Sequence, residues 1–447
     1  MVMSIPVLRG GQERASRDSR MLHDVNGDPL AEVHEAPALL AELTVKAMRQ
    51  APPMPLQERL AVLAEAGRLF AEAPLGGQTP QEYCRVQALA SGVPVAVARQ
   101  TLARTRDDSA LLGEVVGRQS PAGAGRTARW VRRGCVLGVV APSNHPATHG
   151  AWLQAVAMGY RVAVRPGARD PFTPLRLVRA LLEAGLDPHA AALLPGSHSA
   201  ADRLVRAADL ALVYGGEDTV ARLRGDGRVL VRGPGRSKIL LDGPYDEETL
   251  DHLVAEIASD GGVRCTNTTA VLTSGDHQAL AEALAERLAR LPVHPVTDDR
   301  AVLPVRPRKE AEGLRAAVGR AAQGAPDLTA RHYPEGPLTP AGPDSVALRP
   351  AVVPVDRSDH PALRTELPFP CVWVAPWHPS EGVGPLTDSL ALTLLTDRAS
   401  LVDEALESPT VRTVLHGRVE GWWKDPYLPH DGYLGQFLKE ARGFAAA

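Results

Sequence analysis

Between residues 136 and 241 the chain alternates short apolar runs with longer amphipathic segments, and this alternation narrows its possible folds. The predicted strands are Val136–Val140, Arg161–Val164, Ala191–Leu194, Ala211–Tyr214, Arg228–Val231 and Ser237–Leu241. Segments with helical spacing separate most of them. Strands joined by helices form βαβ units, so we expect a doubly wound parallel sheet in an α/β fold.

Two further regions extend this core. Apolar residues recur at three-to-four spacing from about residue 36 to residue 113, which predicts helices. A second α/β unit begins near Gly243, with predicted helices Glu247–Ser259 and Asp276–Arg290 on either side of the strand Ala270–Thr273. Because 447 residues exceed what one hydrophobic core organises, we expect two or three domains.

Composition excludes several functional classes. A net charge of −3 and an aromatic content of 4% argue against nucleic acid or an anionic membrane as the partner. No apolar run approaches the roughly 20 residues that span a bilayer, and residues 1–20 lack the features of a secretory signal. The cysteines lack C-x-x-C spacing, which favours a reducing cytoplasm and opposes a disulfide framework or a zinc site. We expect a cytoplasmic protein without a metal site.

One cysteine has neighbours that are unusual for a core residue. Cys265 follows Gly261-Gly262-Val263-Arg264 and precedes Thr266-Asn267, so small and polar residues flank it. A lone cysteine is more often a buried hydrophobe than a nucleophile. However, Asn144 ends the turn Pro142-Ser143-Asn144 after a predicted strand and could donate its amide to an oxyanion. A thiol nucleophile and an amide donor together indicate an acyl-transfer enzyme.

Other candidate residues also follow predicted strands. Gly215 and Gly216 separate a strand from a helix, where free N–H groups can bind phosphate, although glycine pairs are also ordinary turn residues. Arg165 ends another strand, and Glu366 precedes Leu-Pro-Phe-Pro. Taken alone, Arg165 could be a solvated side chain and Glu366 could pair with Arg364. No strand ends in G-x-G-x-x-G, so the ordinary Rossmann fingerprint is absent from the sequence.

In chain order, these segments resemble the motifs of the aldehyde dehydrogenase superfamily. Pro142–Pro146 is similar to the family's P-W-N-x-P, Arg165–Gly167 to its K-P-S and Val213–Gly216 to its F-T-G-S. Gly262–Cys265 is similar to G-Q-x-C, and Glu366–Pro370 to E-x-F-G-P. The resemblance covers roughly residues 132–374. It implies a Rossmann-type cofactor domain, an α/β catalytic domain and a small oligomerisation element.

The resemblance also implies roles for individual residues. Cys265 would be the nucleophile, and the Asn144 side chain would form the oxyanion hole with the Cys265 backbone N–H. The implied cofactor-binding residues are Pro142, Ser143, Arg165, Arg169, Gly215, Gly216, Glu366 and Phe369. In relatives that prefer NAD an acidic residue soon follows K-P-S, whereas here Ala168 and Arg169 stand there. This favours NADP(H), with NAD(H) possible, unless Arg169 pairs with Asp170 or solvent.

The chain departs from the family at one catalytic position. The family's E-L-G-G-K carries a glutamate that activates water, but Val231 stands at that position, 34 residues before Cys265. General-base assistance is typically worth about 10²–10⁴-fold. Branches that act on acyl thioesters, the CoA-acylating enzymes and acyl-CoA reductases, also lack this glutamate. We therefore predict reduction of an acyl thioester to an aldehyde through an acyl-Cys265 intermediate. The alternatives are a hydrolytic aldehyde dehydrogenase with a displaced base and a catalytically silent member that acts as a binding or assembly partner.

The predicted organisation follows from the polar, Gly/Arg/Ser-rich composition of residues 1–20 and, for the rest, from the pattern of elements and the same resemblance. We expect a mobile arm over residues 1–20, a nicotinamide-cofactor-binding domain over 21–118 and 135–242, and a catalytic domain over 243–420. Residues 119–134 and 421–447 are expected to serve as linker, oligomerisation and tail elements, because Trp422, Trp423 and Tyr427 suggest burial against another subunit. The expected partners are an acyl thioester of CoA or of an acyl carrier protein, or an aldehyde, and further copies in a homodimer or homotetramer.

Overall fold

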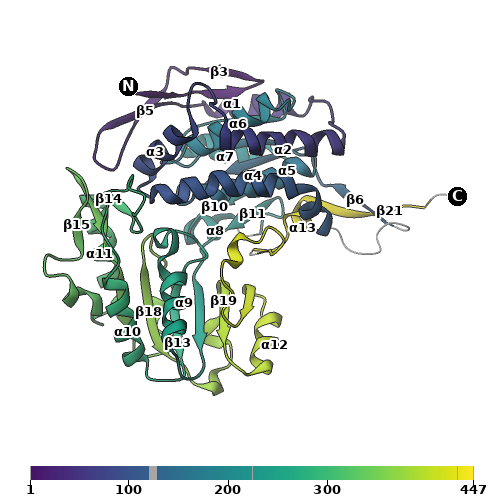
Figure 1. The fold of residues 1–447 in the computed structure, drawn as a ribbon. Helices are drawn as coiled ribbons and strands as arrows, with labels where there is room; N and C mark the ends of the chain where they lie inside the picture. The colour runs from purple at the N-terminus through teal and green to yellow at the C-terminus, as the bar shows by residue number, and fades with distance from the viewer. Residues whose placement is uncertain (1, 120–127, 224, 430, 446–447) are drawn as a thin grey trace.

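A computed structural model describes residues 2–119, 128–223, 225–429 and 431–445 of the chain. Two lobes, each built around its own parallel sheet, lie one above the other in Figure 1. The first half of the chain forms the upper lobe, and most of the second half forms the lower lobe. The end of the chain returns to the upper lobe, where it pairs with an earlier strand.

The sheet of the first lobe contains seven strands in the order β11-β10-β7-β8-β9-β2-β3. The parallel strands are β7 (Val136–Val140), β8 (Arg161–Arg165), β9 (Ala191–Leu193), β10 (Leu210–Tyr214) and β11 (Val229–Arg232). Helices α5 (Gly150–Ala157), α6 (Phe172–Glu183), α7 (His198–Ala207) and α8 (Glu217–Leu223) alternate with them. This confirms the predicted doubly wound sheet, whose strand order reverses between β7 and β10.

Four helices precede this alternation. They are α1 (Ala38–Met48), α2 (Leu56–Glu72), α3 (Pro80–Ser91) and α4 (Val95–Arg118), as the spacing of apolar residues predicts. Helix α3 begins with a capping box in which Thr79 and Glu82 bind each other's backbone N–H groups, and it ends at Gly92 in a left-handed conformation. Helix α4 crosses the side of the upper lobe that faces the lower lobe (Figure 1).

The prediction of a mobile arm over residues 1–20 is wrong. Strands β1 (Met3–Ile5), β2 (Val7–Arg9) and β3 (Gln12–Arg14) lie there, followed by β4 (Ser19–His23), which pairs with β5 (Pro29–His34). Strand β2 pairs with β9 and thereby extends the first sheet. The physical reason is that Ile5, Val7 and Leu8 are apolar and fully buried, which anchors the segment.

The second lobe is built on a six-stranded parallel sheet in the order β17-β18-β13-β12-β19-β20. Its strands are β12 (Ser237–Leu241), β13 (Thr268–Thr273), β17 (Ala351–Pro354), β18 (Cys371–Pro376), β19 (Ser389–Leu395) and β20 (Val411–His416). The accompanying helices are α9 (Glu247–Ala258), α10 (His277–Ala289), α11 (Arg308–Ala322) and α12 (Ala399–Glu407).

The division between the lobes differs from the predicted boundary at residue 242. Strand β12 lies between β13 and β19 in the second sheet, where Ile239 and Leu240 are fully buried. The chain therefore passes from one lobe to the other at residues 233–236. Burial on both faces of a parallel sheet explains why this apolar strand belongs to the centre of the second lobe.

Besides the three-stranded sheet of β1, β5 and β4, two smaller sheets complete the fold. Strands β14 (Val305–Pro307), β15 (Leu338–Pro340) and β16 (Ser345–Leu348) form one. The other is an antiparallel ribbon of β6 (Ala128–Arg132) and β21 (Lys439–Gly443), which projects from the body after the short helix α13 (Leu434–Leu438) (Figure 1). Assembly through residues 119–134 and 421–447 stays a prediction, and residues 120–127 of that linker lie outside the described part of the chain.

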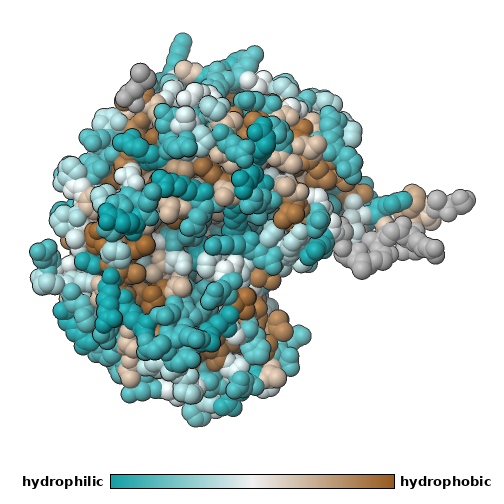
Figure 2. All heavy atoms as spheres, viewed as in Figure 1, coloured by the Kyte–Doolittle hydropathy of each residue, from teal (hydrophilic) through white to brown (hydrophobic). Residues whose placement is uncertain are grey.

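The surface carries mainly hydrophilic residues, with apolar residues gathered near the junction of the lobes (Figure 2). The molecule is hollowed between the lobes on the side from which the ribbon projects. Among the helices of the described residues, none combines the length and the apolar character needed to cross a membrane.

Candidate active site

A cavity of about 410 Å³ lies where the two lobes meet. The carboxyl ends of β7, β10 and β11 face it from the first sheet, and the loop before β13 faces it from the second. Helices α4 and α5 and the tail residues 422–423, 425–429 and 431–434 contribute to its walls. The predicted site residues that line it are Pro142, Asn144, Gly215, Gly216, Cys265 and Glu366. Six residues from four separate segments therefore meet as predicted from the sequence.

The loop that carries Cys265 begins with a left-handed stretch after α9. Asp260, Gly261 and Gly262 have φ values of 55°, 76° and 66°. A Cβ atom on Gly262 would lie 2.5 Å from the backbone nitrogen of Pro370, so only glycine fits this close approach. Asn267 then fixes the loop, because its Oδ1 accepts the Arg264 backbone N–H at 2.8 Å and its Nδ2 donates to the Glu256 carbonyl at 3.0 Å.

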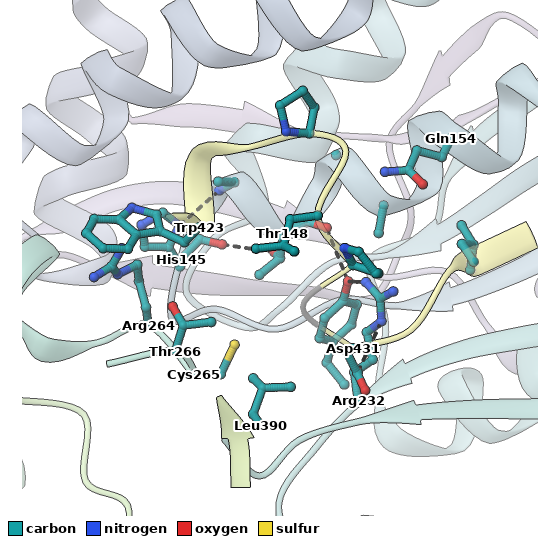
Figure 3. Close-up of a pocket in the computed structure, with 18 of the residues that line it drawn as sticks. His145, Thr148, Gln154, Arg232, Arg264, Cys265, Thr266, Leu390, Trp423 and Asp431 are labelled. Atoms are coloured by element: carbon teal, nitrogen blue, oxygen red, sulfur yellow. Dashed lines mark hydrogen bonds and ion pairs between the residues drawn. The ribbon is translucent and has the colours of Figure 1, made fainter. Parts of the chain in front are cut away.

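This loop presents the thiol to the cavity. Figure 3 shows the Cys265 sulfur between Thr266 and Leu390, with Arg264 and Trp423 on one side and Arg232 and Asp431 on the other. Burial raises the pKa of the Cys265 thiol to about 12, and the carboxylates of Glu366 and Asp431 add to the rise, while Arg232 and Arg264 oppose it. In the free protein the thiol is therefore protonated at neutral pH.

The raised pKa predicts how alkylation of Cys265 depends on pH. Only the thiolate reacts with iodoacetamide, so the rate should rise about tenfold per pH unit from pH 7 to pH 10 without levelling off. An ordinary thiol, with a pKa near 8.5, levels off above about pH 9. Peptide mass spectrometry of Cys265 labelling, with free N-acetylcysteine as the reference, measures this. A plateau below pH 9 would contradict the burial of the thiol.

Asn144 lies beside the cysteine loop. Its Nδ2 donates a hydrogen bond to the Val263 carbonyl at 2.9 Å, which ties the turn after β7 to the residues just before Cys265. The amide carries a second N–H on the same nitrogen. Since Asn144 and Cys265 line one cavity, this second N–H is available to an oxyanion formed at the cysteine.

The crossing segment 233–236 passes tightly against the cysteine. A Cβ atom on Gly235 would lie 1.9 Å from the Cys265 carbonyl oxygen, which also accepts a hydrogen bond from Ser237 Oγ at 3.2 Å. Glu366 Oε2 accepts the Gly235 N–H at 2.6 Å. Gly235 therefore contacts both the Cys265 loop and Glu366. A side chain at position 235 would overlap the Cys265 backbone.

This contact predicts a large effect of a single methyl group. Gly235→Ala should displace the Cys265 backbone, lower the free energy of unfolding by roughly 1–3 kcal/mol as overpacking does, and reduce kcat. Urea unfolding and kcat measured on the same sample check this. Gly227→Ala is the matched control, since no described atom lies within 4 Å of its Cβ position. An unchanged stability and kcat in Gly235→Ala would show that the contact is not as tight as described.

Comparison with known sequences identifies the family. The sequence profile of the aldehyde dehydrogenase family matches residues 12–383, which is most of the chain. The chain belongs to the aldehyde dehydrogenase family. The predicted superfamily is thereby confirmed.

Curated relatives match over a shorter stretch. A Drosophila melanogaster protein named as a probable mitochondrial methylmalonate-semialdehyde/malonate-semialdehyde dehydrogenase, acylating, is 28% identical over 165 residues. These cover 35% of this chain and 32% of that protein. A phenylacetaldehyde dehydrogenase of Pseudomonas fluorescens is 30% identical over 165 residues, covering 34% and 32%. The chain thus spans about a third of the length of the curated relatives it matches.

Solved structures match over nearly the whole chain. An indole-3-acetaldehyde dehydrogenase complexed with NAD+ aligns with a TM-score of 0.83 at 16% identity, covering 99% of this chain and 97% of that one. A gamma-glutamyl-gamma-aminobutyraldehyde dehydrogenase from Burkholderia cenocepacia aligns with a TM-score of 0.82 at 18% identity, covering 99% and 97%. At these identities the likeness shows the fold, which is the aldehyde dehydrogenase fold that the motifs predict.

Four of the predicted cofactor residues of this aldehyde dehydrogenase lie apart from the cavity lining. Ser143 Oγ accepts the Arg169 backbone N–H at 3.1 Å, just beyond the cavity wall. Arg165 ends β8 and donates from Nε to the Gly196 carbonyl at 3.0 Å. The Arg169 guanidinium forms an ion pair with Glu310, and not with Asp170, which accepts the Thr173 backbone N–H. Phe369 is fully buried in the core of the second lobe.

These positions bear on two expectations. Arg169 forms a partly exposed ion pair with Glu310, which compensates part of its charge, and the preference for NADP(H) over NAD(H) stays a prediction. Phe369 packs in the core of the second lobe, and contact of its ring with the cofactor also stays a prediction. Among the described residues, no group of three or more His, Cys, Asp or Glu side chains is arranged to hold a metal ion.

Two buried arginine pairs in this cavity were not predicted from the sequence. Arg232 follows Val231, lies 3.4 Å from Asp431 Oδ2 and donates to the Tyr214 hydroxyl at 3.5 Å. Arg264 precedes Cys265 and stacks on Trp423, with 3.6 Å from its Cζ to the ring centre. Arg232 and Arg264 could have been identified from the sequence as candidate site residues, because each is adjacent to a predicted site position. Asp431 and Trp423 gave none, because their place in the cavity depends on the path of the tail.

The aromatic residues of the tail were expected to pack against another subunit. Trp422 and Tyr427 instead contact residues of their own chain. Trp422 is buried beside Glu256, and its Nε1 donates to Glu256 Oε2 at 3.4 Å. The Tyr427 hydroxyl donates to Glu114 Oε2 on α4 at 2.8 Å. The tail therefore crosses from the second lobe to the first and forms one wall of the cavity.

Proposed function

We propose that this aldehyde dehydrogenase interconverts an acyl thioester and an aldehyde with a nicotinamide dinucleotide, through an acyl-Cys265 intermediate. The thioester is that of CoA or of a carrier-protein arm. The observation that carries the proposal is Val231. It lies in β11, paired with Val213 of β10, and stands 34 residues before Cys265, where the resemblance implies the water-activating glutamate of the family. An alkyl side chain cannot accept a proton, so water attack on an acyl-Cys265 is not assisted there.

A thiol does not need that glutamate. When the acyl group is exchanged between Cys265 and a second thiol, both the entering and the leaving groups are good nucleophiles as thiolates. The relative from Drosophila melanogaster is itself named as acylating. This supports the thioester reaction over hydrolysis.

The residues of the chain divide the work as follows. Cys265 attacks the acyl carbon, and the free N–H of the Asn144 amide donates to the oxygen that becomes negative. Arg232 and Arg264 favour the thiolate because their charges oppose the rise in the pKa of Cys265. When the tetrahedral species collapses, the carrier thiol leaves and the acyl group stays on Cys265.

The first lobe offers a site that fits a nicotinamide dinucleotide. Ligands of doubly wound sheets bind at the carboxyl ends of the strands where the strand order reverses, here between β7 and β10. Gly216 follows β10, and among the described residues no atom lies within 4 Å of its Cβ position, so a phosphate could approach its backbone. Glu366 lies on the Cys265 side of the same cavity, where it could bind a ribose hydroxyl. When bound, the nicotinamide supplies or accepts the hydride.

A hydrolytic aldehyde dehydrogenase is the second candidate. Glu366 and Asp431 line the cavity, and burial raises the pKa of each carboxyl above its usual value, which is the property of a general base. However, Glu366 accepts the Gly235 N–H and Asp431 pairs with Arg232, so both carboxylates already have partners.

Product analysis decides between the two. The enzyme is incubated with acyl thioesters and NADH or NADPH, and separately with aldehydes and the oxidised cofactors, with and without free CoA. The proposal predicts aldehyde and free thiol in the first reaction, and thioester formation that requires CoA in the second. Acid formed from aldehyde without CoA, together with no reduction of any thioester, would establish the hydrolytic reaction.

A further inference from the structure

Arg264 is a buried charge whose N–H groups make no hydrogen bond to the described residues. Only 6% of its side chain is exposed, and within the described part of the chain Nε, Nη1 and Nη2 all lack a hydrogen-bond acceptor. The nearest carboxylate oxygen is Asp260 Oδ2, 3.4 Å from Nε. Buried guanidinium groups are normally hydrogen-bonded, so this arrangement requires an explanation.

The carboxylates around Arg264 already have other partners. Asp260 Oδ2 lies 3.3 Å from His145 Nε2, and Glu256 Oε2 accepts the Trp422 indole N–H at 3.4 Å. Burial also raises the pKa of Glu256, which reduces its negative charge. Asp260 therefore offsets part of the charge of Arg264 but does not satisfy its N–H donors.

The position of the guanidinium is fixed by an aromatic ring. Its Cζ lies 3.6 Å from the centre of the Trp423 ring, so the group is held by the stacking contact between the two. Arg264 and Trp423 line the same cavity as Cys265, on one side of the sulfur (Figure 3). A ligand whose reacting carbon is at Cys265 can therefore place a second group beside Arg264.

We propose that Arg264 binds a carboxylate on the acyl chain of the substrate, which makes the substrate a carboxylated aldehyde or the thioester of a dicarboxylic acid. A carboxylate offers two coplanar acceptor oxygens that match the guanidinium fork. The two carboxylate oxygens would accept hydrogen bonds from the Arg264 N–H groups, which have no acceptor among the described residues. The inference rests on the proposed function only for the reacting carbonyl group; the carboxylate site itself depends on Arg264 and Trp423.

Binding tests the site without catalysis. Calorimetric titration of the Cys265→Ala protein with malonate, succinate and glutarate should show at least one dicarboxylate that binds, while its diamide binds at least tenfold more weakly. Arg264→Gln should weaken the dicarboxylate at least tenfold and leave the diamide unchanged. Arg106→Gln is the matched control on α4, exposed and paired with Asp107 outside the cavity, and should change nothing. Inorganic phosphate is titrated in parallel, to test whether Arg264 binds any anion or prefers a carboxylate.

The outcomes separate clearly. If no dicarboxylate binds, if Arg264→Gln binds it as well as the parent, or if phosphate binds more tightly through Arg264, the carboxylate site is wrong. Should Arg264→Gln not fold, Arg264→Lys keeps the charge but loses the fork, and a smaller weakening of at least threefold is expected. Thermal unfolding of each variant checks its folding.

Kinetics then separate this inference from the proposed reaction. For an aldehyde with a terminal carboxylate and for its methyl ester, kcat/KM should favour the carboxylate at least tenfold, and Arg264→Gln should remove that preference. Equal kcat/KM values for the two would overturn the inference even if thioesters acylate Cys265. Conversely, if dicarboxylates bind through Arg264 but no thioester acylates Cys265, the carboxylate site is supported and the thioester reaction is contradicted.

Discussion

Cys265→Ala should lower turnover by roughly 10⁴-fold or more, because removal of the nucleophile of an acyl-transfer enzyme removes the covalent route altogether. The substitution is small, and the loop around it is held by Asn267 and by the Ser237 contact to the backbone carbonyl, neither of which uses the sulfur. Cofactor affinity should therefore stay within about twofold. Steady-state kinetics and titration of nicotinamide fluorescence measure the two quantities.

Cys135→Ala is the matched control. Its thiol is half-buried and lies at the other end of β7, away from the catalytic cavity. Its turnover should stay within about twofold of the parent. If Cys265→Ala kept more than a few per cent of the activity, Cys265 would not be the nucleophile.

Asn144→Ala should lower kcat by roughly 10²–10³-fold, the usual cost of one oxyanion donor. KM should change by less than about threefold, because the donor acts on the charge that develops during the reaction. Asn144→Asp is the sharper variant, since it keeps the shape and replaces the donating nitrogen by an oxygen. Both variants are compared with the parent by kcat, KM and the alkylation rate of Cys265.

The alkylation rate distinguishes catalysis from positioning. Asn144 also donates to the Val263 carbonyl, so its loss could shift the cysteine loop. If the loop stays in place, Asn144→Ala is alkylated at Cys265 as fast as the parent while kcat falls. An unchanged kcat, or a fall in kcat matched by an equal change in the alkylation rate, would remove Asn144 from the oxyanion hole.

The part of the fold that could be predicted is the part in which local sequence and tertiary structure agree. The strands from Val136 to Tyr214 are buried on both faces, so their apolar runs are continuous and bounded by helices. Strands β1, β2 and β3 were missed because each is only three residues long, and β2 extends the first sheet only by pairing with the distant strand β9. Strand β12 was assigned to the wrong lobe because its own sequence contains no information about which sheet it joins.

The candidate site shows the same division. Asn144, Gly216 and Cys265 could be predicted because each lies in a short motif whose spacing is visible in the chain, and the fold brings them to one cavity. Trp423 and Asp431 could not, since they reach the cavity only through the path of the tail across α4. The pairing of Arg169 with Glu310, more than one hundred residues away, was equally invisible.

Acylation of Cys265 by a thioester can be observed by mass spectrometry of the intact protein. The enzyme is incubated without nicotinamide with a panel of acyl-CoAs and acyl-pantetheines, including thioesters of dicarboxylic acids. We expect an acyl adduct that maps to Cys265, is absent from Cys265→Ala and is discharged to an aldehyde when NADH or NADPH is added. The absence of an adduct from every thioester, with acid formed from aldehydes and the oxidised cofactor, would contradict this expectation.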